Sequence, residues 1–115
     1  MTNNVELIGR VVRKPELKMT DNDKKYAYIT LAVQRDYKNK DGVYETDFID
    51  AILWGTPAEY ACNYLDKGSL AGLKGSIQTR NVELENGKKE IKLDIVGNKI
   101  SFLAKSKSME NREDR

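Results

Sequence analysis

The stretch Thr46-Asp-Phe-Ile-Asp-Ala-Ile-Leu-Trp-Gly-Thr56 decides the fold of this chain. Its side chains alternate between two faces, and a period of two is typical of a β-strand. One face carries Ile49, Ala51 and Leu53. The other carries Phe48, Asp50, Ile52 and Trp54. A strand needs only one apolar face to join a core, so the second face is either buried against another element or open as a platform for a flat molecule.

The composition restricts the classes of protein that this chain can form. Its 115 residues are enough for one domain with its own core. The single cysteine, Cys62, excludes an internal disulfide and leaves a reducing cytosol as the default compartment. The chain has no histidine, which removes the commonest general base and metal ligand. We therefore expect no enzyme, no metal and no cofactor, and we assign Cys62 to helix packing.

The N-terminal residues lack the basic start and apolar run of a secretion signal, and no stretch approaches the roughly 20 apolar residues of a membrane span. Twenty basic residues against eighteen acidic ones give a net charge of only +2. This charge does not by itself indicate nucleic acid, so any basic binding surface must come from local clustering.

Two further strands precede the opening stretch. Residues 5–12 alternate as a first strand, and Gly9 within it predicts a bend. Residues 26–35 form the second strand, with an unbroken apolar face at positions 27, 29, 31 and 33. The loop 36–44 contains the turn signal Asp41-Gly42, so the second and third strands are predicted to form a hairpin.

A short helix follows the third strand. Thr56 is predicted as its N-cap, Pro57 as its first residue, and Glu59 as the partner of Thr56 in a capping box. The buried stripe is expected to consist of Ala58, Ala61, Cys62 and Leu65. Gly68 is expected to stop the helix.

Residues 70–80 form a fourth strand, with glycines at positions 72 and 75 that suit sharp curvature. Asn86-Gly87 is a strong hairpin turn, residues 91–95 return, and residues 100–103 extend or close the sheet. This order predicts an all-β fold with one short helix, an OB-fold five-stranded Greek-key barrel over residues 1–104. An α+β sandwich is the alternative. Residues 105–115 are predicted to be a disordered polar tail.

The chain resembles the bacterial and phage single-stranded DNA-binding proteins. The matching pieces are Asn4-Val5-Glu6-Leu7-Ile8-Gly9-Arg10, Pro15-Glu16-Leu17, Thr30-Leu31-Ala32-Val33, Asp47-Phe48-Ile49, Ala58-Glu59, Tyr64-Leu65-Asp66-Lys67-Gly68-Ser69, Gln78-Thr79-Arg80 and Asn86-Gly87-Lys88. The resemblance implies an oligomer, usually a tetramer, that wraps single-stranded DNA without sequence preference. It also implies the cytoplasm, either beside the nucleoid or in the host of a phage.

The chain departs from that family in two places. Chromosomal members usually end in an acidic tip that recruits other proteins, whereas this tail is mixed in charge and ends in Asp114-Arg115. We therefore expect no recruitment through the tail, and a phage, plasmid or otherwise specialised member. Some members carry an aromatic residue just after the Thr-Arg of the fourth strand, where this chain has Asn81-Val82.

Three aromatic residues are predicted to stack on DNA bases, a contact that tolerates any sequence because every base has a π-face. Phe48 and Trp54 lie about 20 Å apart along one strand, at 3.3–3.4 Å per residue. Core packing is the alternative for both. Tyr37 is the third, at a position where the family often has an aromatic. Tyr26 and Tyr28 are left between DNA and a neighbouring subunit, and Tyr60 and Tyr64 are assigned to helix packing.

Eight basic residues on the hairpins and strands are predicted to contact phosphates; solvated surface charge is the alternative for each. They are Arg10, Arg35, Lys38, Lys40, Lys74, Arg80, Lys88 and Lys89. Asp47 and Asp50 fall on opposite faces of a strand, so that geometry does not let them share a metal. Three rival functions stay open: an RNA-binding or replication-restart role, a barrel used only for protein contacts, and a nuclease.

Overall fold

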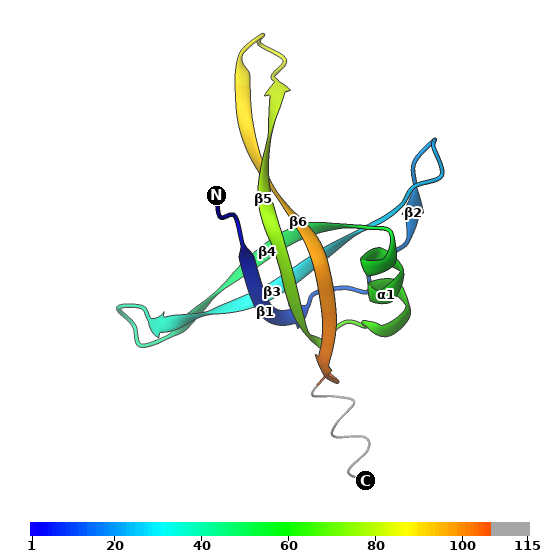
Figure 1. Cartoon of the computed structure of the whole chain (residues 1–115). Coiled ribbons are helices and arrows are strands. Elements are labelled where there is room, and N and C mark those ends of the chain that lie inside the picture. The colour runs from blue at the N-terminus through cyan, green and yellow to red at the C-terminus, as the bar shows by residue number, and fades with distance from the viewer. Residues whose placement is uncertain (107–115) are drawn as a thin grey trace.

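The computed structural model describes residues 1–106. Six strands and one helix follow one another in this range (Figure 1). They are β1 (Val5–Val11), β2 (Lys18–Met19), β3 (Lys25–Lys38), β4 (Tyr44–Trp54), α1 (Thr56–Tyr64), β5 (Leu70–Glu83) and β6 (Lys89–Ala104). Within the described range no helix has the length and apolar character needed to cross a membrane.

Five of the strands close into a barrel. The hydrogen-bonded order is β1-β5-β6-β4-β3, and β1 pairs again with β3 to complete the ring. All of these pairings are antiparallel except that of β4 with β6, which is parallel. The short β2 pairs only with the start of β3. The closed ring confirms the predicted OB-type barrel and does not fit the sandwich.

The core lies inside the barrel, where the alternating faces of β3 and β4 meet. Ala27, Ile29 and Leu31 of β3 are buried, as are Ala51 and Leu53 of β4. The helix α1 contacts β3, β4 and β6 and adds three buried residues to the same cluster, Ala58, Ala61 and the adjoining Leu65. The predicted apolar faces of the strands and the helix are therefore confirmed, with Cys62 partly buried beside them.

Two glycines let the barrel curve sharply. Gly9 lies where β1 changes partner from β5 to β3, and a Cβ there would lie 2.5 Å from the carbonyl oxygen of Ala32. Gly75 lies at a register shift between β5 and β6, and a Cβ there would collide with the carbonyl group of Val96. The predicted bend at Gly9 thus has a cause, since any larger residue would push the strands apart.

The start of the helix differs from the prediction. Gly55 is the N-cap, with φ of 67°, and no side chain caps the first turn. The carboxylate of Glu59 instead accepts a hydrogen bond from Lys25 Nζ at 2.5 Å. The predicted capping box is therefore wrong, because the chain turns from β4 into α1 through a backbone shape that favours glycine. The helix also ends at Tyr64, before Gly68.

Two strands are longer than predicted, and one strand is additional. The third element, β3, continues to Lys38, so Tyr37 and Lys38 lie on a strand end and not in a loop. The final strand, β6, is continuous over 16 residues, because β5 pairs with it from Leu70 to Glu83. The short β2 was not predicted.

The predicted tail, residues 105–115, lies outside the described residues except for its first two. The carbonyl oxygen of Lys105 accepts a hydrogen bond from Arg10 Nη1 at 3.0 Å. Ser106 is buried, and its Cβ lies 2.8 Å from where a side chain at Gly68 would begin. Ser106 therefore lies against the turn between α1 and β5, while the Lys105 backbone is held by Arg10 of β1.

Candidate nucleic-acid interface

The outward side of the β3–β4 hairpin forms an aromatic face. We use this name for four cross-strand pairs, Tyr26–Trp54, Tyr28–Ile52, Thr30–Asp50 and Ala32–Phe48. Residues directly opposite in an antiparallel pair point to the same side. The side chain of Phe48 is 68% exposed and that of Trp54 is 42% exposed. Both rings are therefore uncovered, and core packing does not account for them.

Three rings gather at one end of the aromatic face. The ring centroid of Tyr26 lies 5.3 Å from that of Trp54 and 6.0 Å from that of Tyr28, with the second pair perpendicular. Tyr28 is 59% exposed. Edge and tilted contacts of this kind favour a fixed arrangement of the three rings. The sequence did not decide whether Tyr28 contacts DNA or a neighbouring subunit. In the structure Tyr28 belongs to the same surface as Trp54.

The β3–β4 hairpin extends beyond the barrel as one of two arms (Figure 1). Tyr37 is exposed near its tip. The Nζ of Lys38 lies 5.6 Å from the ring centroid of Tyr44, its cross-strand partner. Lys40 lies in the loop. Sequence reasoning missed Tyr44, which the hairpin pairing with Lys38 could have indicated.

Arg35 is already occupied by carboxylates. Its Nε and Nη2 donate to the two oxygens of Asp47, each at 3.0 Å, and its Nη1 donates to Glu45 at 2.7 Å. The hydrogen bond from Arg35 holds the pKa of the Asp47 carboxyl below its usual value, and the same bond raises the pKa of Arg35. By the alternation of β3, Arg35 falls on the same side of the strand as the core-facing Leu31. Phe48 pairs with Ala32 and lies on the opposite side.

Three other predicted phosphate contacts also have partners on the protein. Arg10 Nη1 donates to the carbonyl oxygens of Gly68 and Lys105. Arg80 Nε donates to Asp94 Oδ2 at 2.8 Å, and Lys74 Nζ lies 3.8 Å from Glu6 Oε1. A phosphate would have to share these cations or displace their partners.

The remaining cations lie on the two arms. Lys38, Lys40, Lys88 and Lys89 form no ion pair with any residue in the range 1–106. Lys88 and Lys89 lie at the tip of the β5–β6 hairpin, the second arm in Figure 1. The structure thus divides the predicted cations into a paired group on the barrel and an unpaired group at the tips of the arms.

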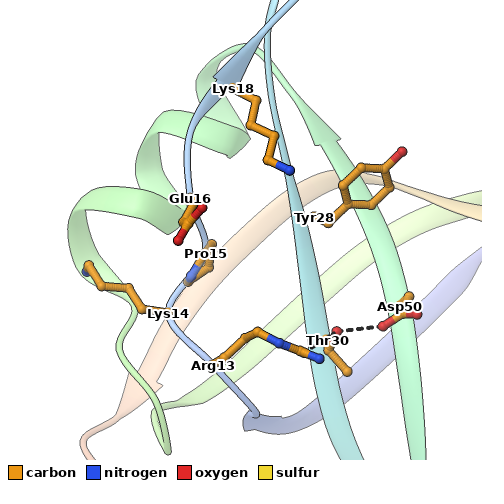
Figure 2. A pocket seen from close by; sticks show the side chains of 8 residues that line it. All are labelled: Arg13, Lys14, Pro15, Glu16, Lys18, Tyr28, Thr30 and Asp50. Carbon is orange, nitrogen blue, oxygen red and sulfur yellow. Dashed lines mark hydrogen bonds between the residues drawn. The ribbon is translucent and has the colours of Figure 1, made fainter.

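Two adjoining hollows lie on the aromatic face. One, of about 360 Å³, is shown in Figure 2 and includes Arg13, Lys18, Tyr28, Thr30 and Asp50. The other, of about 580 Å³, shares Tyr28 and Asp50 and continues to Arg80 on β5 and Asp94 on β6. Arg13, Lys18 and Asp50 were not predicted as site residues.

The acidic and cysteine side chains of the described residues are not gathered into a metal site. No group of three or more Cys, Asp or Glu side chains among them is placed to hold a metal ion. Asp47 and Asp50 lie on opposite faces of β4, as predicted, with Asp47 held by Arg35 and Asp50 by Thr30. Burial raises the pKa of the Cys62 thiol, which makes it a poor nucleophile.

A closed five-stranded barrel with exposed rings on one hairpin and lysines on two arms defines the class of OB-fold binding proteins. The Single-strand binding protein family model matches residues 2–103, and the chain belongs to that family.

Its relatives carry matching names. Single-stranded DNA-binding protein 3 of Listeria innocua is 46% identical over 103 residues, which is 90% of this chain and 64% of the relative. The Single-stranded DNA-binding protein of Bacillus cereus is 43% identical, with the same share of this chain and 61% of its own length covered. Single-stranded DNA-binding protein A of Bacillus subtilis is 42% identical, with 60% of its length covered. The chain thus spans less than two thirds of these relatives.

Proposed function

We propose that this protein binds single-stranded DNA without sequence preference and protects it during replication, recombination or repair. The observation that supports this most directly is the exposure of Phe48 and Trp54 on the aromatic face. Stacking of a base on an aromatic side chain contributes about 1–3 kcal/mol and tolerates any base. Family membership and the names of the relatives point the same way. The role is binding and not catalysis.

The stacking rings and the lysines have separate tasks in this proposal. Phe48, Trp54 and Tyr37 stack on bases, and Lys38, Lys40, Lys88 and Lys89 contact phosphates from the arms. Arg10, Arg35, Lys74 and Arg80 contribute less, because carbonyl or carboxylate oxygens already hold them. We place the protein in the bacterial cytoplasm and favour a phage, plasmid or specialised member.

We further propose a homo-oligomer, with a tetramer as the expected form. Large apolar side chains on β1 and β6 support it, since Ile8, Ile91 and Leu93 are each more than 60% exposed. Ile91 and Leu93 alternate along β6 in phase with Ile95, which packs against the core, so the β5–β6 arm has an apolar side. Sites joined in one assembly favour long strands over short ones.

Titrating the protein with oligo-dT while following the fluorescence of Trp54 tests the function. The chain has one Trp, so the signal reports on the aromatic face alone. We expect quenching, a gel shift, and loss of affinity with added salt. An absence of both quenching and gel shift would leave only a protein-contact role. Equal or tighter binding of oligo-U would indicate RNA, and sizing with oligo-dT of graded lengths would give the subunit number.

A further inference from the structure

We propose that a DNA strand crossing Tyr28 lays its phosphates over residues 13–18, where Arg13 and Lys18 contact them, and that Asp50 repels phosphates from the opposite side of the ring. The inference rests on the proposed function. It adds two phosphate contacts that the sequence did not indicate and one residue that limits affinity. It is carried by the unequal charge on the two sides of Tyr28 (Figure 2).

Tyr28 lies on the border between the two hollows of the aromatic face. It lines both of them, and its side chain is 59% exposed. The smaller hollow is bounded by residues of the 13–18 segment, which joins β1 to β2, and the larger one by Arg80 of β5 and residues 93–95 of β6. A base on the Tyr28 ring leaves its phosphate on one side or the other, so the charges of the two hollows decide the course of the backbone.

The charged residues that line the two hollows differ in balance. The smaller hollow has three basic residues, Arg13, Lys14 and Lys18, against two acidic ones, Glu16 and Asp50. The larger hollow has one basic residue, Arg80, against two acidic ones, Asp50 and Asp94. Lys14 is already paired with Asp66 at 3.0 Å, so the positive character of the smaller hollow rests on Arg13 and Lys18.

The 13–18 segment thus provides two available cations. Arg13 and Lys18 are exposed and form no ion pair within residues 1–106. Arg13 Nη1 donates to a neutral hydroxyl, Thr30 Oγ1, at 3.3 Å, so its charge is not cancelled and its other N–H groups can donate to a phosphate. The Lys18 side chain extends toward Tyr28 (Figure 2).

Asp50 is the surplus charge on the side of β5 and β6. Arg80 Nε donates to Asp94 Oδ2 at 2.8 Å, so these two charges cancel. Asp50 is exposed and forms no ion pair within the described range. Exposed charges act on each other over about 8 Å at physiological ionic strength. A phosphate on this side therefore meets a carboxylate, whereas a phosphate over the 13–18 segment meets two cations.

Thr30 keeps the cation and the carboxylate apart. Its Oγ1 accepts from Arg13 and donates its proton to Asp50 Oδ1 at 2.5 Å. Arg13 and Asp50 therefore flank one hydroxyl, with no ion pair between them. Both charges stay available to the strand, and the change of sign across the hairpin directs the backbone toward the 13–18 segment.

Titrations of the full chain with oligo-dT at several salt concentrations test the two cations. The double variant Arg13→Gln, Lys18→Gln should lower the affinity and reduce the slope of log affinity against log salt by about 1.4, at about 0.7 per phosphate. Glutamine at position 13 retains N–H donors for Thr30. Arg80→Gln is the control on the opposite side of Tyr28 and should change the slope less.

Asp50→Asn tests the repulsion. It should tighten the binding of oligo-dT roughly two- to fivefold at low salt, because the phosphate no longer meets a carboxylate, and the gain should shrink as salt is added. Asp50→Glu retains the charge and should show no gain. Asp21→Asn is the matched control, since Asp21 lies in the turn after β2, lines neither hollow and forms no ion pair within residues 1–106. It changes the net charge equally and should gain less.

An unchanged slope in the double variant, or a gain in Asp50→Asn no larger than that in Asp21→Asn, would overturn the inference and leave the proposed function standing. Failure of the unmodified protein to bind oligo-dT would overturn both. Thermal unfolding of each variant shows whether it is folded.

Discussion

At the scale of single residues, Phe48 has the clearest task. It lies across from Ala32, a small residue that leaves its ring uncovered on the aromatic face. In the proposed function this exposed ring is a surface on which a base stacks. Trp54 is less exposed because Tyr26 packs against its ring.

Phe48→Ala should therefore weaken DNA binding without weakening the fold. We expect a loss of about 1–3 kcal/mol in the free energy of binding oligo-dT, the contribution of one stacked base. Tyr64→Ala is the control, since Tyr64 is also exposed but lies on α1. Fluorescence titration measures both, and equal losses in the two variants would contradict a stacking role for Phe48.

The ion pair of Arg35 and Asp47 predicts a pH dependence of stability. The pKa of Asp47 is lowered in the folded protein, so its contribution is present at neutral pH and is lost as the pH falls below the ordinary value of 3.8. The pair is exposed, so the contribution is small.

A double-mutant cycle of Arg35→Gln and Asp47→Asn measures that contribution. Urea unfolding at neutral pH should show that the two changes are not additive, and the difference should vanish in acid. Additive effects at neutral pH would show that the ion pair contributes nothing to stability.

At the scale of elements, each long hairpin depends on close approach of its strands. In β5, a Cβ at Gly75 would collide with the backbone of Val96, which cannot move aside as a flexible side chain could. At Gly72 of the same strand, the nearest atom would be Leu103 Cδ1 at 3.5 Å, an ordinary contact. Both glycines were predicted to allow curvature. A side chain is therefore excluded at Gly75 but can be accommodated at Gly72.

Gly75→Ala should destabilise the protein by about 1–3 kcal/mol, the usual result of forcing extra atoms into a packed site. Gly72→Ala is the matched control and should change the free energy of unfolding much less. Urea denaturation compares the two variants, and similar midpoints for both would contradict the assignment of Gly75 to the register shift.

The local pattern predicted the faces of β3 and β4, because alternation within one strand determines which residues face the core. It could not predict the capping of α1, which depends on the positive φ at Gly55 where the chain leaves β4. It also missed that Arg35 is paired with Asp47, since that contact depends on the register across the hairpin. The alternation predicted Phe48 for stacking but left core packing open, and the folded barrel shows that its ring is exposed.

At the scale of the whole molecule, charge is arranged in two zones. Arg10, Arg35 and Arg80 are matched by carboxylates or carbonyl oxygens, whereas Lys38, Lys40, Lys88 and Lys89 at the tips of the arms form no ion pair within residues 1–106. Net charge is only +2, so this distribution, and not the total, determines where a polyanion is held.

The salt dependence of DNA binding should reveal the two zones. Replacing Lys88 and Lys89 with Gln should reduce the slope of log affinity against log salt by about 1.4, at about 0.7 per phosphate on a single strand. Arg80→Gln should change it less than one such lysine, because Asp94 already neutralises Arg80. Titrations with oligo-dT at several salt concentrations measure these slopes. An equal change in slope per residue for Arg80 and for the two lysines would contradict the division into paired and unpaired cations.

The closure of the barrel depends on two short ladders, one between its two long hairpins and one between β1 and β3. The parallel ladder of β4 and β6 pairs Ala51, Ile52 and Leu53 with residues 95–97, and β1 meets β3 only at Arg10 and Val11. Within each hairpin, by contrast, the two strands pair along most of their length. We therefore expect the ring to open first at these two seams, with both hairpins still intact.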